Sequence, residues 1–254
     1  MNPVYSTVIA VCLTSFQLLR WDVRVTGSEH IPATGPGVVA TNHIGYLDFV
    51  FAGYGVRERD RRRLRFVAKR EVFDHPVSGP LMRAMGHISV DREGHASAVL
   101  REVQSALAGG DLVGVFPEGT ISPSFVPLSG RPGAARMAMA AGAPLVPGAL
   151  WGTQRIFTTG RKPRPAPGTV ITIDFGPPIT YEPDEEPVVV HERLMTQIRE
   201  LVDHAQRSYP QRPTSQPDAW WQPAHLGGSA PTPQQAERQA REDRAARRAR
   251  VRKP

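Results

Sequence analysis

Short apolar runs alternate with amphipathic stretches through the middle of this chain. The run from Leu112 to Phe116 is continuously apolar, which is typical of a strand covered by helices on both faces of a sheet. The stretch 95–108 instead has apolar residues at every fourth position from Val99 to Leu107, and it ends at two glycines, as helices often do. The alternation of these two patterns predicts an α/β sandwich.

Further runs extend the pattern in both directions. Strands are predicted at 23–25, 38–40, 64–68, 87–90, 112–116, 145–150 and 170–173, and helical stretches at 81–85, 95–108, 133–141 and 188–207. The predicted fold class is therefore α/β, with a mixed, largely parallel central sheet flanked by helices. In such folds, functional side chains gather in the loops beyond the strand ends.

Residues 1–21 are predicted to form a helix that lies at a membrane interface. The segment from Val4 to Leu19 is mostly apolar, but it is too short and too polar to span a bilayer, which takes about 20 apolar residues. No basic residue precedes it and no clear cleavage site follows it, unlike a signal peptide. Arg20 and Trp21 suit the headgroup level. The alternative is a helix that covers the domain's own core.

Residues 22–208 are predicted to form the main domain, and residues 209–254 a proline-rich segment with a basic tail. Proline, glycine, serine and glutamine recur from Tyr209 to Thr232, which predicts an extended, exposed wrap or linker. Trp220 and Trp221 within it either anchor at a membrane interface or pack the segment onto the domain. Thr232 followed by a proline then predicts the start of a final helix.

The final helix carries most of the net charge. From Ala236 onward there are eight basic and three acidic residues, which account for five of the seven net positive charges of the chain. Such a tail is expected to bind anionic lipid electrostatically, and the alternative is a solvated or disordered end. Nucleic acid is not expected as a partner, because no aromatic residue follows Trp221.

Composition adds a limit on the class of protein. A chain of 254 residues with 40% hydrophobic residues suits one sizeable core. Cys12 is its single cysteine, which excludes an intramolecular disulfide and a multi-cysteine metal site. Because no disulfide framework is possible, exposure of the domain to the cytosol is the simpler expectation.

A histidine and an aspartate follow the predicted strand 38–40. His43 and Asp48 lie five residues apart, which on a regular helix turns one side chain about 140° from the other. A strand-end turn that leads into a helix can bring them together, and Gly45 permits the required dihedral angles. Such a pair suits a general base with its orienting carboxylate. The alternative is a histidine in a turn and an aspartate in a first helical turn.

Four blocks in order resemble motifs of the glycerolipid acyltransferase family, which includes bacterial 1-acylglycerol-3-phosphate acyltransferases. The blocks are 42–48, an NHxxxxD motif; 86–92, a glycine-to-arginine motif; 116–120, with the sequence FPEGT; and 143–147, with the sequence APLVP. The resemblance covers about residues 20–180 and identifies 22–208 as a catalytic domain. A lipase-type Gly-x-Ser-x-Gly motif is absent, which argues against a serine hydrolase.

The resemblance implies a role for each matched side chain. His43 would be the general base and Asp48 its orienting partner, so that an acceptor hydroxyl attacks a thioester directly. Glu118 would accept hydrogen bonds from a hydroxyl or from neighbouring main chain. The substrate-binding residues implied in this way are Asn42, Arg92, Glu118, Gly119, Thr120 and Arg131.

The implied acceptor is 1-acylglycerol-3-phosphate, acylated at its sn-2 hydroxyl. Its phosphate calls for arginines, and Arg92 is the leading candidate, with Arg131 at a position where the family often has a lysine. Many family members have a basic residue where this chain has Ile121, so another lysophospholipid or a glycolipid stays open as acceptor.

The donor implied by the resemblance is acyl-coenzyme A or an acyl carrier protein thioester, with no cofactor and no bound metal. A phospholipid-remodelling transacylase and a non-enzymatic lipid-binding adaptor are the alternatives. The basic segment from Arg57 to Arg65 could receive the negative charge of either donor. The expected location is the cytoplasmic face of the membrane, as a peripheral or monotopic protein.

Overall fold

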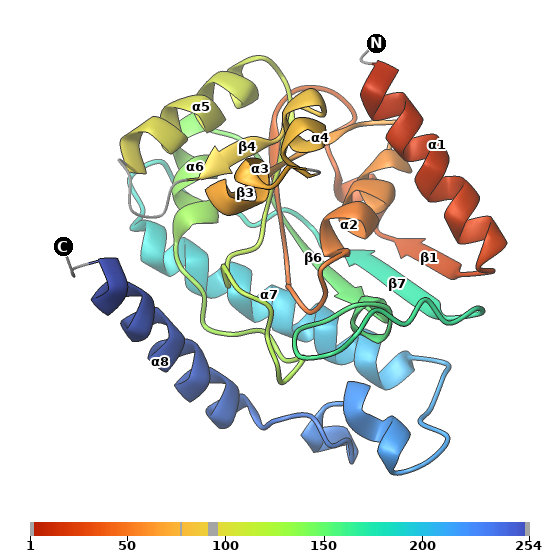
Figure 1. The fold of residues 1–254 in the computed structure, drawn as a ribbon. Coiled ribbons are helices and arrows are strands. Elements are labelled where there is room, and N and C mark those ends of the chain that lie inside the picture. The colour runs from red at the N-terminus through yellow and green to blue at the C-terminus, as the bar shows by residue number, and fades with distance from the viewer. Residues whose placement is uncertain (1–2, 77, 91–95, 252–254) are drawn as a thin grey trace.

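The computed structural model of the protein describes residues 3–76, 78–90 and 96–251 (Figure 1). Its strands are β1 (Asp22–Thr26), β2 (Gly37–Thr41), β3 (Leu64–Lys69), β4 (Ile88–Val90), β5 (Leu112–Val115), β6 (Leu145–Trp151) and β7 (Val170–Phe175). They form a seven-stranded sheet in the order β1-β7-β6-β2-β5-β3-β4. All neighbouring strands are parallel except β6 and β7, which are antiparallel. The prediction of a mixed, largely parallel sheet is confirmed.

Helices cover both faces of this sheet. They are α1 (Pro3–Leu18), α2 (Asp48–Arg57), α3 (Arg70–Asp74), α4 (Ser78–Ala84), α5 (Ala96–Ala108), α6 (Gly133–Ala141), α7 (Pro187–Ser208) and α8 (Pro233–Val251). One core cluster packs α5, α6 and α7 against the sheet, and a second packs α1 and α2 against its other face (Figure 1). The strands β2, β5 and β6 are buried along their whole length, and burial on both faces explains why Thr41 is their one polar residue.

The amino-terminal helix packs one side on the domain and leaves the other exposed. Tyr5 and Phe16 are buried, and the Phe16 ring stacks on Phe51 of α2 at 5.0 Å between centroids. Val11 and Leu18, seven residues apart on the outer side, are 60% and 78% exposed. The helix thus covers part of the core, as in the alternative considered from the sequence, and its outer side exposes apolar residues together with Thr7, Thr14 and Gln17. No helix among the described residues is long and apolar enough to cross a membrane.

The proline-rich segment after α7 differs from the extended, exposed wrap expected from its composition. It contains two short 3₁₀ turns, Pro217–Trp221 and Ala224–Leu226. Trp221 is buried against Tyr209, with ring centroids 5.8 Å apart, whereas Trp220 is half-buried. Packing, the second of the two roles considered for these tryptophans, is therefore the one observed for Trp221. Aromatic burial outweighs the local preference for an open chain.

The final helix begins where the sequence predicts it. Gln235 N–H donates to Thr232 Oγ1 at 3.3 Å, and Thr232 N–H donates to Gln235 Oε1 at 2.8 Å, so each residue caps the other. In the first turns of α8, Ala236 and Ala240 are buried against Leu128. The sequence does not predict this packing face, because two alanines one turn apart give a weak signal.

Candidate active site

The candidate residues lie in loops that follow three adjacent strands. His43 follows β2, Glu118 follows β5 and Thr153 follows β6, with β2 in the middle of the three. Because these strands are parallel, their carboxyl ends open at the same edge of the sheet. Side chains distant in sequence therefore meet around His43.

The structure brings His43 and Asp48 into contact. His43 Nδ1 lies 2.9 Å from Asp48 Oδ2, and the carboxylate is fully buried while the imidazole is 19% exposed. Since an ionised carboxylate only accepts hydrogen bonds, Nδ1 carries the proton and Nε2 keeps its lone pair. Within the described part of the chain, Nε2 has no hydrogen-bond partner.

A tight turn between β2 and α2 creates this contact. Ile44 N–H and Gly45 N–H both donate to Asp48 Oδ2, at 2.6 and 2.8 Å, so the first residue of α2 also holds the turn that precedes it. Space is tight at Gly45, since a Cβ there would lie 3.0 Å from Phe157 O. Its φ is not positive, so the dihedral freedom expected of this glycine is not what the turn uses.

Thr153 is a partner of the aspartate that sequence analysis missed. Its hydroxyl donates to Asp48 Oδ1 at 2.5 Å, while the other oxygen faces His43. Thr153 is fully buried just after β6, in a loop of the kind where functional residues gather. Its position after a strand was the available signal, but the matched fourth block ends at residue 147.

Glu118 bridges two loops through their main chains. Its Oε1 accepts from His43 N–H and its Oε2 from Leu128 N–H, both at 2.8 Å. Ser122 N–H donates to His43 O at 2.8 Å, so the loop after β5 holds both sides of the histidine backbone. Burial raises the pKa of Glu118 to about 8, although the two N–H donors act in the opposite direction.

Aromatic rings fix the plane of the imidazole. Phe116, at the start of the loop after β5, stacks on His43 with ring centroids 4.1 Å apart and an interplanar angle of 10°. Phe66 of β3 stacks on the far side of this pair, 5.2 Å from Phe116. The imidazole is therefore held by an aromatic ring on its face and by a carboxylate at its edge.

Asn42 is buried, and both ends of its amide bond to main chain. Its Nδ2 donates to Leu150 O at 3.1 Å, and its Oδ1 accepts from Leu150 N–H at 2.7 Å. This pair ties the end of β2 to β6 immediately before His43. A positioning role is thus the one that its contacts support.

The block 86–92 is only partly described. Gly86 has a φ of +75°, which a glycine adopts readily, and it ends the turn after α4. His87 is buried, and its Nδ1 accepts from Phe66 N–H at 2.9 Å. Burial, followed by the charge of Arg65, lowers the pKa of His87 to about 4, so this histidine is neutral at physiological pH. Arg92, the leading phosphate-binding candidate, lies outside the described residues.

The remaining candidates belong to the loop between β5 and α6. Gly119 has a φ of +65°, so the turn uses its conformational freedom. Thr120 and Ile121 are half-buried beside it. Arg131 is exposed, and its main-chain N–H donates to Pro117 O at 3.1 Å, so the loop folds back on itself near Glu118.

Two helices hold this loop from outside. His191 of α7 contacts Ser129 O through its Nε2 at 2.9 Å. From α8, Glu237 Oε1 accepts from Ser129 N–H at 2.6 Å, next to the contact of Leu128 with Ala236 and Ala240. The carboxyl-terminal helix therefore contacts the same part of the loop, Leu128 and Ser129, to which Glu118 is bonded through Leu128 N–H.

A mixed α/β sheet with an oriented histidine at its carboxyl edge suits an enzyme that uses a general base, and comparisons with known proteins give its class. The chain belongs to the Acyltransferase family, whose profile matches residues 22–151, and it is an acyltransferase. It is 33% identical over 146 residues to the 1-acyl-sn-glycerol-3-phosphate acyltransferase of Bacillus subtilis, covering 56% of this chain and 71% of that one.

Two further relatives agree. Human 1-acyl-sn-glycerol-3-phosphate acyltransferase alpha is 31% identical over 188 residues, which cover 70% of this chain and 64% of the human one. The crystal structure of the 1-acyl-sn-glycerophosphate acyltransferase PlsC from Thermotoga maritima superposes with a TM-score of 0.66 at 25% identity, covering 82% of this chain and 81% of that one. The resemblance inferred from the four blocks is confirmed.

The Glu118→Gln variant is expected to be less stable by about 1–3 kcal/mol, because the amide nitrogen cannot accept from one of the two N–H donors. The effect should depend on pH. Between pH 4.5 and about 8 the folded protein retains a proton that the unfolded chain releases, so the free energy of unfolding contributed by Glu118 falls as pH rises. Glutamine does not titrate, so the difference in the free energy of unfolding between the parent and the variant should narrow from pH 5 to pH 8.

Urea unfolding at several pH values measures this difference. Glu200→Gln, at an exposed position on α7, is the matched control and should track the parent at every pH. A gap between parent and Glu118→Gln that stays constant or widens with pH would contradict the assigned shift.

Proposed function

We propose that this acyltransferase moves a fatty acyl group from a thioester donor to the sn-2 hydroxyl of 1-acylglycerol-3-phosphate. The observation that carries the proposal is the 2.9 Å contact between His43 Nδ1 and the buried Asp48 carboxylate, which leaves Nε2 as the basic atom of a partly exposed ring. The names of the relatives from Bacillus subtilis and human support the choice of acceptor.

In the proposed reaction, the acceptor hydroxyl gives its proton to His43 Nε2 as its oxygen attacks the thioester carbonyl carbon. A C–O bond forms, the C–S bond breaks, and the departing thiolate takes the proton back from the imidazolium. Asp48 stabilises that imidazolium and keeps the ring oriented. No enzyme nucleophile is needed for this reaction. Cys12 is unsuited to be one, because it is half-buried in α1 and burial raises the pKa of its thiol.

The phosphate of the acceptor is assigned to Arg92 of the second block and to Arg131, which follows the third block. Arg131 is exposed on the loop that Glu118 holds, and Arg92 is the last residue of the block that contains β4. Arginine suits this task because its fork of N–H donors matches phosphate oxygens. Ile121 supplies no charge between them, so a lysophospholipid with another headgroup is the second candidate acceptor.

A membrane surface is proposed as the place of action, on the cytoplasmic side. The outer stripe of α1 exposes Val4, Val11 and Leu18. The basic half of α8 continues beyond the alanines that dock on Leu128. Apolar insertion and electrostatic attraction act together in peripheral proteins, so either element alone would bind weakly.

Acyl transfer to a panel of lysophospholipids and a lysoglycolipid, with acyl-coenzyme A and acyl carrier protein donors, tests the proposed reaction. Lysophosphatidate is expected to be the best acceptor, and His43→Ala should lower turnover by roughly 10²–10⁴-fold. His204→Ala, at an exposed position on α7, is the matched control and should keep parental turnover. Parental turnover in purified His43→Ala would eliminate the proposed base, and transfer from intact phospholipid alone would identify a transacylase.

Arg92→Ala and Arg131→Ala should each raise the Michaelis constant for lysophosphatidate by about tenfold, because a charge-assisted hydrogen bond to the phosphate is lost. The Michaelis constant for an acyl acceptor without a phosphate should not change. Arg136→Ala, at an exposed position on α6, serves as the control. An unaltered constant for lysophosphatidate in both variants would place its phosphate elsewhere.

Truncation after Glu242 should reduce binding to anionic vesicles at low salt at least tenfold, since it removes six basic residues and one acidic residue. The docking residues Ala236, Glu237 and Ala240 remain, so the catalytic loop is left in place.

The double variant Val11→Gln/Leu18→Gln should instead weaken binding to neutral and anionic vesicles alike. Vesicle cosedimentation measures both effects, and unchanged binding of either variant would remove the corresponding element from the proposal.

A further inference from the structure

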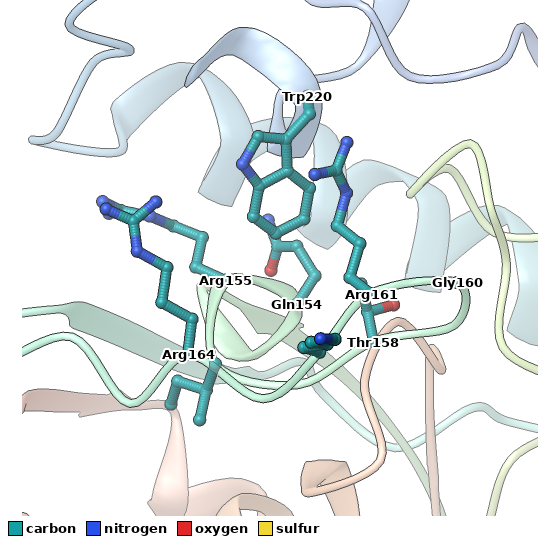
Figure 2. A pocket seen from close by; sticks show the side chains of 9 residues that line it. Gln154, Arg155, Thr158, Gly160, Arg161, Arg164 and Trp220 are labelled. Atoms are coloured by element: carbon teal, nitrogen blue, oxygen red, sulfur yellow. The ribbon is translucent and has the colours of Figure 1, made fainter. Parts of the chain in front are cut away.

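A basic pocket of about 290 Å³ lies beside the candidate active site, between the segment 153–164 and the carboxyl-terminal segment. Its lining includes four cationic side chains and one indole: Arg155, Arg161, Lys162, Arg164 and Trp220. Figure 2 shows Arg161 beside the indole, with Arg155 and Arg164 extending on the other side of the pocket. Ile156 is the one aliphatic residue in the lining, so the pocket does not suit an acyl chain.

Among the described residues, none of these four cations forms an ion pair with a carboxylate. Arg155 donates to two neutral partners, Tyr209 Oη at 3.0 Å and Gln211 Oε1, and its guanidinium lies 4.5 Å from the Trp221 ring centroid. Asp218 acts on Arg155 only through space. Four neighbouring positive charges without a paired carboxylate create a strong attraction for a polyanion.

The indole adds a second recognition element. The guanidinium of Arg161 lies 4.0 Å from the centroid of the Trp220 ring, and Trp220 is half-buried while Arg161 is exposed. An aromatic ring next to cations is the combination that binds a nucleotide, because the base stacks on the ring while the phosphates take the charges.

In the basic segment from Arg57 to Arg65, two arginines are bound by the protein itself. Arg62 donates to the carbonyl oxygens of Pro32, Gly35 and Gly110, and Arg65 pairs with Asp111 at 2.8 Å. These side chains of the segment from Arg57 to Arg65 stabilise loops. Arg62 and Arg65 are therefore less available to the negative charge of a donor than the exposed Arg161 of the pocket.

The pocket shares a loop with the candidate catalytic pair. Within the segment 153–164, Thr153 donates to Asp48 Oδ1, and the Thr158 hydroxyl donates to Ile44 O at 2.7 Å. Phe157 O accepts from Tyr46 N–H at 2.9 Å. The segment that lines the pocket is thus bonded directly to the turn 43–48, which carries His43.

We propose that this pocket binds the phosphorylated adenosine end of a coenzyme A thioester, which places its pantetheine arm along the turn 43–48 toward His43. The inference rests on the proposed acyl transfer from a thioester. Coenzyme A has a purine and three phosphate groups, which match one indole and four cations. A lysophospholipid headgroup has a single phosphate and no base, so it would leave the indole and most of the charge unused.

Titration calorimetry on the full chain at low salt tests the pocket without turnover. Coenzyme A and adenosine 3′,5′-bisphosphate are expected to bind, and pantetheine and inorganic phosphate to bind at least tenfold more weakly. Arg161→Glu should raise the dissociation constant for coenzyme A by about tenfold or more, because an attractive charge becomes a repulsive one. Trp220→Ala should raise this dissociation constant by a similar factor, whereas Trp220→Phe should bind coenzyme A nearly as tightly as the parent. Arg61→Glu, an exposed arginine of the other basic segment, should leave it unchanged.

Unchanged binding of coenzyme A to Arg161→Glu would overturn the proposal, as would equal affinity for inorganic phosphate or a loss of binding in Arg61→Glu. Transfer from acyl carrier protein with no binding of coenzyme A would also overturn it, while leaving the acyltransferase reaction intact. Conversely, binding of coenzyme A through Arg161 without acylation of any lysophospholipid would support the pocket and refute the proposed function.

Discussion

The buried carboxylate of Asp48 is the interaction on which the rest of the site depends. It accepts four hydrogen bonds, from His43 Nδ1, Ile44 N–H, Gly45 N–H and the Thr153 hydroxyl. A fully buried charge is stable only when its oxygens are satisfied in this way. The same bonds close the turn after β2, start α2 and join the segment after β6, so local structure and imidazole orientation have one cause.

Glu118 plays a similar part for the second loop. Through the main chains of His43 and Leu128 it connects the turn after β2 to the loop after β5, which α7 and α8 hold from outside. The basic carboxyl-terminal helix is therefore in contact with the loop that supports the histidine. If that helix binds anionic lipid as proposed, its attachment orients the catalytic edge of the sheet relative to the membrane surface.

The sequence predicted the sheet well because its central strands are buried on both faces and carry few polar residues. The predicted strands 112–116 and 145–150 differ by only one residue at an end from β5 and β6. The predicted histidine and aspartate meet because the turn between them is local. By contrast, the exposed wrap predicted for 209–232 packs Trp221 into a core cluster, and the helix after it docks through two alanines. Composition does not reveal such contacts, because they depend on the partners that the tertiary structure supplies, such as Leu128 for the two alanines.

By itself, the sequence determined the fold class, the family and the spacing of the pair formed by His43 and Asp48, since hydrophobic period and short motifs are local properties. Only the tertiary structure showed that Thr153 holds the aspartate, that Asn42 and Glu118 bond to main chain, and that Arg161 lies over the Trp220 ring in the lining of a basic pocket. Each of these contacts joins segments that parallel strands and a packed carboxyl-terminal segment bring together. Their partners are set by strand order and packing, which a one-dimensional pattern does not record.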